Sequence, residues 1–279
     1  MTGTADIGPL DVLVCLKFVP DPAQLRADAS GQPDLIQAPL RISNFDENAI
    51  ETALQLTAQH GGRAFGLSVI RGRKPPPDVL LRALAMGLNA LYLVVDETDM
   101  ASDPFRLAVA IAAAAKVMRE AEAVPLWHLL ICGEASADEY NAQIGPRLAV
   151  ALDLPAITHA IRIELERNLL IARRSVDGRC ETVETELPAL ATVGTEINHA
   201  RIPTVLQIMG AGRKPVREMT LHKLLEPDLD AMKRYPTLKT MAVFALPSTR
   251  KRILIDGGNP KESVNQLLTR LGADGEIRF

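Results

Sequence analysis

Short apolar runs alternate with amphipathic stretches over the first half of the chain. The apolar runs predict buried strands at residues 11–19, 65–70, 90–95 and 127–133. Stretches with apolar positions at helical spacing, bounded by Gly or Pro, predict helices at residues 44–60, 75–87, 104–122 and 142–152. This alternation predicts an α/β fold, an open and mostly parallel sheet with helices on both faces. In such a sheet, ligands bind at the carboxyl ends of the strands.

The pattern changes after Pro155. Strands are predicted at residues 161–171, 172–176, 181–186 and 189–193. Asp177–Gly178 is a strong signal for a hairpin turn, so these strands are expected to form an antiparallel addition to the same domain. Residues 201–225 are rich in basic residues, Pro and Gly, which predicts an exposed loop.

The C-terminal part predicts an extended arm. A strand-like stretch at 252–255 precedes a helix over 260–271, with Pro at its first position. One face of this helix is apolar, with Val264, Leu267, Leu268 and Leu271. We therefore expect a first domain over residues 1–225 and a linker and docking arm over residues 226–279.

Composition narrows the class of protein. The chain has 279 residues, of which 47% are hydrophobic but only 4% aromatic, so Ala, Val, Leu and Ile are expected to build the core. A net charge of -3 gives no basic excess, which argues against a nucleic-acid partner. The N-terminus shows no secretory-signal pattern, and the apolar runs are too short to cross a bilayer. A cytoplasmic protein without direct membrane insertion is expected.

The cysteines and histidines predict neither a metal site nor a catalytic one. Cys15, Cys132 and Cys180 form no CxxC pair, and the first two lie in apolar runs, which favours buried reduced thiols. The five histidines show no metal-ligand spacing, and no Ser–His–Asp or Cys–His arrangement can be argued. Asp46 and Glu47 are typical of a helix start. No catalytic residue and no enzyme activity are predicted.

The segment with candidate chemistry is residues 133–146, which run from a predicted strand end into a helix start. Small residues there let the backbone approach a ligand, and free N–H groups at a helix start suit phosphate. Ser136, Asn141 and Gln143 can add hydrogen bonds. Asp138 suits either a helix cap or an acceptor for a ribose hydroxyl or a loop amide. The segment lacks both the GxGxxG and the Walker spacing, so a ligand loop and an ordinary capped turn are equally supported.

Several segments keep the order and spacing of one known family between about residues 11 and 214. They are VLVCLKFVPD (12–21), NFDENAIE (44–51), LRALAMG (81–87), QIGP (143–146), the Asp177–Gly178 hairpin with ELPA (186–189), EINHARIP (196–203) and QIM (207–209). Together they resemble the beta subunits of electron-transfer flavoproteins, including the branch associated with nitrogen fixation. The resemblance implies a fold like that of the adenine-nucleotide α-hydrolases.

The resemblance also implies an electron carrier that is not catalytic alone. Such a beta subunit binds an adenine nucleotide and pairs with an FAD-carrying alpha subunit, and the pair passes electrons from dehydrogenases to an acceptor oxidoreductase. In the common branch the nucleotide is AMP. In an electron-bifurcating branch a second FAD takes its place and accepts hydride from NADH. The residues do not choose between these branches, and a nucleotide-sensing regulatory protein is the alternative from another class.

The nucleotide contacts implied by the resemblance lie at three strand ends and at the first helix start. They are Cys15, Ser43, Asn44, Phe45, Asp46, Arg71, Gly133, Glu134, Ala135, Ser136, Ala137, Asp138, Tyr140, Asn141, Ala142, Gln143 and Ile144. Backbone groups of the last loop would hold the phosphate, and the first strand would offer backbone groups to the adenine. The family docks on dehydrogenases through a recognition loop, here about residues 198–214. Its anchor leucine falls on Val205, and Arg213 and Lys214 would steer acidic partners.

Overall fold

The computed structural model describes residues 8–28, 30–97, 99, 101, 103–226, 238, 240–244 and 252–277. The strands are β1 (Leu10–Cys15), β2 (Phe18–Pro20), β3 (Leu40–Ile42), β4 (Gly62–Arg71), β5 (Ala90–Asp96), β6 (Leu129–Gly133), β7 (Ala156–Glu166), β8 (Leu169–Val176), β9 (Arg179–Glu186), β10 (Ala189–Val193) and β11 (Val216–Thr220). The helices are α1 (Asn44–His60), α2 (Pro77–Met86), α3 (Pro104–Ala121), α4 (Ile144–Leu152), α5 (Val205–Ala211), α6 (Leu221–Leu225) and α8 (Pro260–Ala273).

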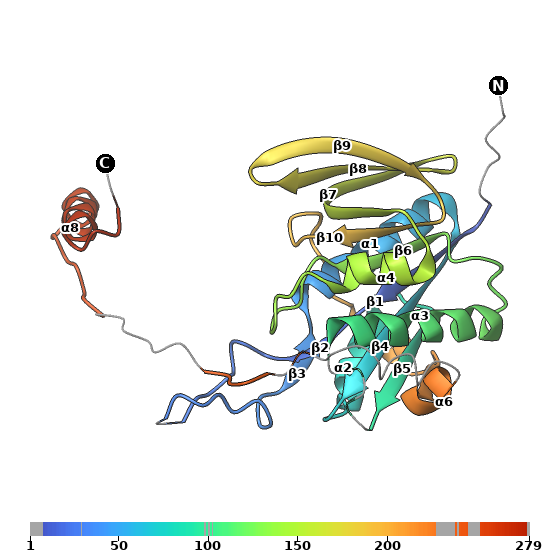
Figure 1. Ribbon diagram of the computed structural model, residues 1–279. Coiled ribbons are helices and arrows are strands. Elements are labelled where there is room, and N and C mark those ends of the chain that lie inside the picture. The colour runs from blue at the N-terminus through green and yellow to red at the C-terminus, as the bar shows by residue number, and fades with distance from the viewer. Residues whose placement is uncertain are drawn as a thin grey trace.

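Nine strands form one twisted sheet in the order β11-β5-β4-β1-β6-β10-β7-β8-β9 (Figure 1). Neighbours from β11 to β7 pair in parallel, whereas β7, β8 and β9 pair antiparallel. Strands β2 and β3 form a separate antiparallel pair. The predicted fold class, a mostly parallel sheet with an antiparallel addition, is therefore confirmed.

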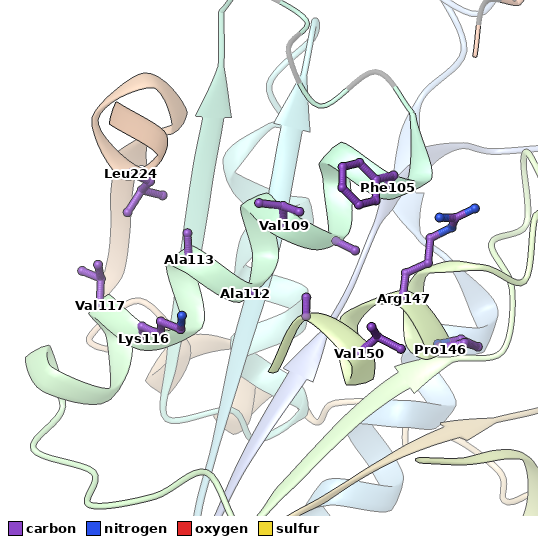
Figure 2. Close-up of a pocket in the computed structure, with 12 residues that line it drawn as sticks. Phe105, Val109, Ala112, Ala113, Lys116, Val117, Pro146, Arg147, Val150 and Leu224 are labelled. Carbon is purple, nitrogen blue, oxygen red and sulfur yellow. The ribbon is translucent and has the colours of Figure 1, made fainter. Parts of the chain in front are cut away.

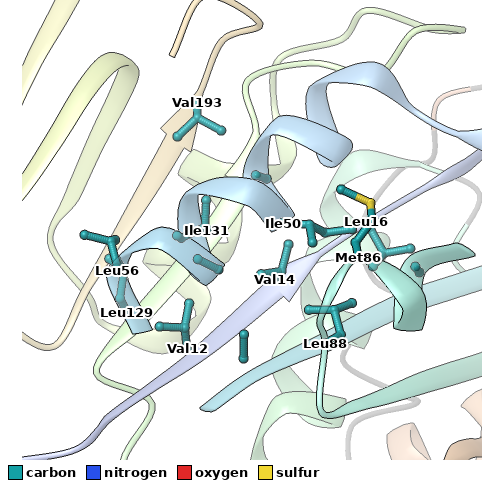
Figure 3. Packing of buried hydrophobic residues seen from close by; sticks show 14 of the residues in the cluster. Val12, Val14, Leu16, Ile50, Leu56, Met86, Leu88, Leu129, Ile131 and Val193 are labelled. Atoms are coloured by element: carbon teal, nitrogen blue, oxygen red, sulfur yellow. The ribbon is translucent and has the colours of Figure 1, made fainter. Parts of the chain in front are cut away.

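Helices cover both faces of the sheet because each central strand is apolar on both sides. In β1, Val12 and Val14 pack in the cluster with α1 and α2, whereas Leu13 and Cys15 pack in the cluster with α3 and α4. Figure 3 shows the first cluster, in which Val12 and Val14 lie below α1. Burying each such Val or Leu side chain contributes roughly 1.5–3 kcal/mol. This two-sided burial fixes β1 at the centre of the molecule.

The helix boundaries follow local chemistry, and the predicted helices at 44–60, 75–87, 104–122 and 142–152 are confirmed to within a few residues. Helix α2 begins with Pro77 and ends at Gly87, whose φ of 142° is accessible to glycine. Helix α3 begins with Pro104, and the Asp103 side chain accepts hydrogen bonds from the N–H groups of Phe105 and Arg106.

Two strand predictions need correction. The run predicted as one strand at 11–19 is split, because the chain leaves the sheet after Cys15 and pairs again only in β2. The run predicted at 161–171 turns at Arg167, which has a left-handed φ of 56°, so that β7 and β8 are separate strands.

The prediction that residues 189–193 belong to the antiparallel addition is wrong. Strand β10 pairs in parallel with both β6 and β7, and all five of its residues are buried. A short, fully buried strand carries no local signal for its direction. Its position in the parallel sheet follows from burial on both faces.

The prediction of an exposed loop over 201–225 is also wrong, and the segment is largely regular in structure. It contains α5, strand β11, which extends the parallel sheet beside β5, and α6, which packs against α3. A capping box between Thr204 and Gln207 starts α5, and this Thr-x-x-Gln spacing was available in the sequence.

The C-terminal helix is confirmed as α8, which stands apart from the α/β body in Figure 1 and has no buried residue. The stretch 252–255, all of it described, forms no regular strand. Among the helices of the described residues, none combines the length and the apolar character needed to cross a membrane.

Candidate nucleotide site

A cavity of about 450 Å³ opens at the carboxyl ends of β1, β4 and β6. Cys15, Arg71 and Gly133, the last residues of these strands, all line it. The starts of α3 and α4 form further walls, and Leu238, Thr240 and Val243 add a wall from the C-terminal part of the chain. Strand β1 lies where the sequential strand order reverses, which is the usual ligand position in open α/β sheets.

The carboxylate of Asp46 lies beneath this cavity and joins two of the strand ends. It accepts hydrogen bonds from the backbone N–H of Lys17 at 2.7 Å and from that of Gly133 at 3.3 Å. Burial raises the pKa of Asp46 to about 7, against the effect of these hydrogen bonds. A Cβ atom at Gly133 would lie 2.6 Å from Asp46 Oδ1, so only glycine fits there.

Ion pairs tie the loop after β6 to the opposite wall of the cavity. Lys17 Nζ lies 2.8 Å from Asp138 Oδ2 and 3.1 Å from Glu139 Oε2. Arg71 lies 3.5 Å from Glu139 and 3.9 Å from Asp99. Burial opposes ionisation of Asp138, but the charge of Lys17 and the hydrogen bonds from Lys17, Ser136 and the Glu139 N–H together outweigh it and lower the pKa of that carboxyl. Both cations that line the cavity are therefore already paired with carboxylates.

The loop itself adopts a constrained conformation. Tyr140 and Ala142 have φ values of 52° and 53°, which non-glycine residues rarely adopt. The Tyr140 ring packs edge-on against Phe45 at 5.6 Å, and the N–H of Ala137 donates to Ser43 Oγ at 3.3 Å. These contacts from the start of α1 hold the loop so that its residues 141–144 face the cavity.

Two thiols form part of the cavity floor. Cys15 and Cys132 are register partners on β1 and β6, and both are free and buried. A hydrogen bond with Cys15, together with burial, raises the pKa of the Cys132 thiol and keeps it neutral. The predicted buried reduced thiols are confirmed for this pair, whereas Cys180 is exposed. In the described part of the chain, no group of three or more His, Cys, Asp and Glu residues is arranged to hold a metal ion.

The family model for the electron transfer flavoprotein domain matches residues 36–224. The electron transfer flavoprotein subunit beta of Thermoanaerobacterium thermosaccharolyticum is 31% identical over 268 residues, which cover 95% of this chain and 98% of that protein. The protein of the same name from Bacillus subtilis is 32% identical over 236 residues, 85% of this chain and 87% of its own length. The chain belongs to the electron transfer flavoprotein beta-subunit family.

Most of the residues that this family resemblance singled out lie around the one cavity. Those that line it are Cys15, Asp46, Arg71, Gly133, Glu134, Ala135, Ser136, Asp138, Asn141, Ala142, Gln143 and Ile144. Ser43, Phe45, Ala137 and Tyr140 do not line it and instead support the loop through the contacts given above. Asn44 is exposed at the start of α1.

Several residues that line the cavity were not predicted from the sequence. Lys17, Asp103 and Glu139 bring charge to the cavity, and Leu238 and Val243 bring apolar surface. Asp103 was detectable only as a helix cap, since Asp before Pro at a helix start is a common signal. Leu238 and Val243 lie in the stretch 226–279, which the sequence predicts only as a linker and arm, so no sequence signal indicates that they line a cavity.

The predicted docking segment forms an apolar surface on α5 and the residues just before it. Ile202, Val205, Leu206 and Met209 are each more than two-thirds exposed. Arg213 is exposed close by. Lys214 points elsewhere, because its Nζ donates to the carbonyl oxygens of Leu84 and Leu88 at the end of α2. Lys214 therefore stabilises the fold rather than presenting its charge to a partner.

A second cavity of about 750 Å³ lies between α3, α4 and α6, away from the strand ends (Figure 2). Val109, Ala112 and Val150 give it apolar walls, with Lys116 and Arg147 at its edge. None of the predicted cofactor contacts lines it. Its few polar groups make it a poorer candidate for a nucleotide than the cavity at the strand ends.

Proposed function

We propose that this chain is the beta subunit of a heterodimeric electron transfer flavoprotein and holds AMP in the cavity at the ends of β1, β4 and β6. It passes electrons between dehydrogenases and an acceptor oxidoreductase only together with an FAD-carrying alpha subunit. The observation that carries the proposal is this polar cavity, at the sheet position that binds ligands, in a member of the electron transfer flavoprotein family.

The walls of the cavity fit a mononucleotide. Gly133, Gln143 and Ile144 bring the main chain of the loop and the start of α4 to the cavity, where backbone N–H groups would hold one phosphate. The close contact of Gly145 with Thr192 packs the first turn of α4 against β10. Cys15 and its neighbours at the end of β1 would contact the adenine. The bound nucleotide would be structural, joining the loop to the strand ends.

Size and charge favour AMP over a second FAD. The cavity measures about 450 Å³, and a flavin dinucleotide is far larger than AMP. The cavity is also rich in acid: Asp46, Asp103, Glu134, Asp138 and Glu139 line it, against Lys17 and Arg71. Because both cations are engaged with Asp138 and Glu139, a second phosphate would meet net negative charge.

Two surfaces would serve protein partners. The apolar side chains of α5 would dock on dehydrogenases, with Val205 as the anchor. The arm over 226–279 would bind the alpha subunit through α8, whose Val264, Leu267 and Leu268 are 38–52% exposed. An amphipathic helix that, among the described residues, has none buried is suited to this role.

Co-expression of the chain with its alpha subunit tests the proposal. The purified pair should show one flavin per heterodimer, and acid extraction should release stoichiometric AMP. Two flavins would identify a bifurcating protein instead, with FAD in this chain. A pair with neither flavin nor adenine nucleotide would overturn the proposal and favour a regulatory protein.

A further inference from the structure

An ion pair with a buried carboxylate fastens the segment before α5 to α1. The Glu51 side chain on α1 is 6% exposed, and that of Arg201 is 38% exposed. Arg201 donates from Nε to Glu51 Oε2 at 2.6 Å, from Nη2 to Oε1 at 3.0 Å and from its backbone N–H to Oε2 at 3.2 Å. Burial opposes ionisation of Glu51, but the hydrogen bonds from Arg201 and Gln55 and the charge of Arg201 together lower its pKa. The carboxylate therefore holds both the side chain and the main chain of Arg201.

Asparagine side chains add to this connection one turn earlier on α1. Asn48 Nδ2 donates to the carbonyl oxygen of Asn198 at 2.8 Å. Asn198 Nδ2 in turn donates to the carbonyl oxygen of Asn48 at 3.1 Å and to Thr52 Oγ1 at 2.8 Å. Asn48, Glu51 and Thr52 share one face of α1, and each is 7% exposed or less. Polar groups of one buried helix face thus hold the chain from Asn198 to Arg201.

Helix α5 depends on anchors at its two ends. At its C-terminal end, Ala211 is buried and Lys214 donates to two carbonyl oxygens at the end of α2. At its N-terminal end, only two residues separate Arg201 from the cap residue Thr204, and one of them is Pro203, whose φ is fixed. Ala211 is the one buried residue of α5, so the rest of the helix adds little packing to hold it in place.

We infer that Glu51 and Arg201 are positioning residues for partner docking, because their ion pair fixes the apolar face of α5 on the α/β body. This inference rests on the proposed function, in which that face docks on dehydrogenases. Without the pair, α5 would be held mainly at its C-terminal end and would spend only part of the time in the docking position. The apparent affinity for a partner falls with the fraction of the protein in the competent conformation.

Arg201→Gln removes the charged fork from this pair and keeps the backbone N–H of residue 201. Arg63→Gln is the matched control. Arg63 donates to Asp11 from Nε at 2.9 Å and from Nη2 at 3.3 Å, and the two side chains are 40% and 8% exposed. Arg63 lies over the Phe65 ring in the cluster that α3 covers, whereas α5 packs in the other cluster. Both variants break one arginine–carboxylate pair, so both should lower the thermal midpoint to a similar extent.

Two measurements on the heterodimer with the full chain separate positioning from stability. The first is hydrogen exchange of the α5 amides, because a helix of seven residues is not stable once it leaves the body. The second is steady-state kinetics with a purified dehydrogenase that reduces the wild-type heterodimer. We expect Arg201→Gln to raise KM for the heterodimer about 3- to 10-fold with kcat unchanged, since the docked complex is the same. The α5 amides should exchange at least about 3-fold faster in this variant.

The other variants should respond differently. Arg201→Lys keeps a charge opposite Glu51, so its KM should rise less than that of Arg201→Gln. Arg63→Gln should change neither KM nor the exchange of the α5 amides.

Three results would overturn the inference. Equal KM values for Arg201→Gln and Arg63→Gln would reduce the Glu51–Arg201 pair to a contribution to stability. Unchanged exchange of the α5 amides in Arg201→Gln would show that the pair does not hold the helix. If Val205→Asp also leaves KM unchanged, or if no dehydrogenase reduces wild type, the docking role in the proposed function fails, and the inference fails with it.

Discussion

The carboxylate of Asp46 lies 2.7 Å from the backbone nitrogen of Lys17, at the point where the chain leaves the central strand. The same carboxylate reaches Gly133 N–H at the end of β6. One side chain on α1 thus holds together two segments that are more than 100 residues apart in the sequence. Lys17 in turn forms an ion pair with Asp138, which ties the loop after β6 to the end of β1.

Asp46 should make stability depend on pH. Its pKa of about 7 in the folded chain exceeds the value near 4 expected after unfolding. Between these values the folded chain binds a proton that the unfolded chain releases. The contribution of protonated Asp46 to the free energy of unfolding is therefore full below pH 4 and falls by roughly 4 kcal/mol as the pH rises to 7. Urea unfolding of nucleotide-free protein at pH 5 and pH 8 should show about 3 kcal/mol of this change, because only the part between pH 5 and pH 7 is sampled, and Asp46→Asn should remove it. Identical pH dependence in wild type and variant would contradict the assignment.

Gly145 should tolerate no side chain while Thr192 is present. A Cβ atom at Gly145 would lie 2.2 Å from Thr192 Cγ2, and both residues are buried. We expect Gly145→Ala to destabilise the chain by about 1–3 kcal/mol and to reduce the nucleotide retained on purification. Thr192→Ser removes the clashing methyl group but keeps the hydroxyl that accepts from His159 N–H at 3.0 Å. The double variant should therefore recover most of the loss in urea unfolding. Equal damage in the single and double variants would show that the clash is not the cause.

Glu139 should determine the preference of the cavity for a nucleotide with one phosphate over a nucleotide with two. Its carboxylate lies between Lys17 and Arg71 at the cavity wall. Glu139→Gln would weaken both pairs and remove one negative charge, so ADP should gain affinity relative to AMP by roughly 2- to 5-fold, a modest change because the side chain is half-exposed. Competition between AMP and ADP measures the ratio. Glu184→Gln, on the distant strand β9, is the control and should leave the ratio unchanged. A ratio unaffected by Glu139→Gln would remove the electrostatic argument against diphosphates.

The exposed face of α5 should govern electron transfer with dehydrogenases. Val205 is 73% exposed and contributes little to the core, so Val205→Asp should leave the thermal midpoint unchanged. If the side chain anchors a partner, the variant should lower kcat/KM for reduction of the heterodimer by a dehydrogenase about 10- to 100-fold. Val150→Asp provides a matched control on α4, where the exposed fraction is 83%. Equal effects of the two variants would rule out a specific docking surface on α5.

Local sequence chemistry determined the helices and much of the sheet. The spacing of apolar residues, together with Pro and Gly at the helix ends, predicted the positions of α1, α2, α3 and α8, because these signals act within a few residues of one another. The order and spacing of the segments that resemble the electron transfer flavoprotein beta subunits also led to the family and to the loop at 133–146. The capping box of α5 was a signal of the same kind that was overlooked.

Only the tertiary structure decided the direction of β10 and the partners of the charged cavity residues. A buried strand looks the same in either direction, so its parallel pairing depends on where the chain re-enters the sheet. The cavity pair Lys17–Asp138 joins residues 121 positions apart, and the sequence around a charged residue does not indicate which distant residue will pair with it. Asp103 looks like any helix cap in the sequence. Only the folded structure shows that Asp103 also lines the cavity at the strand ends.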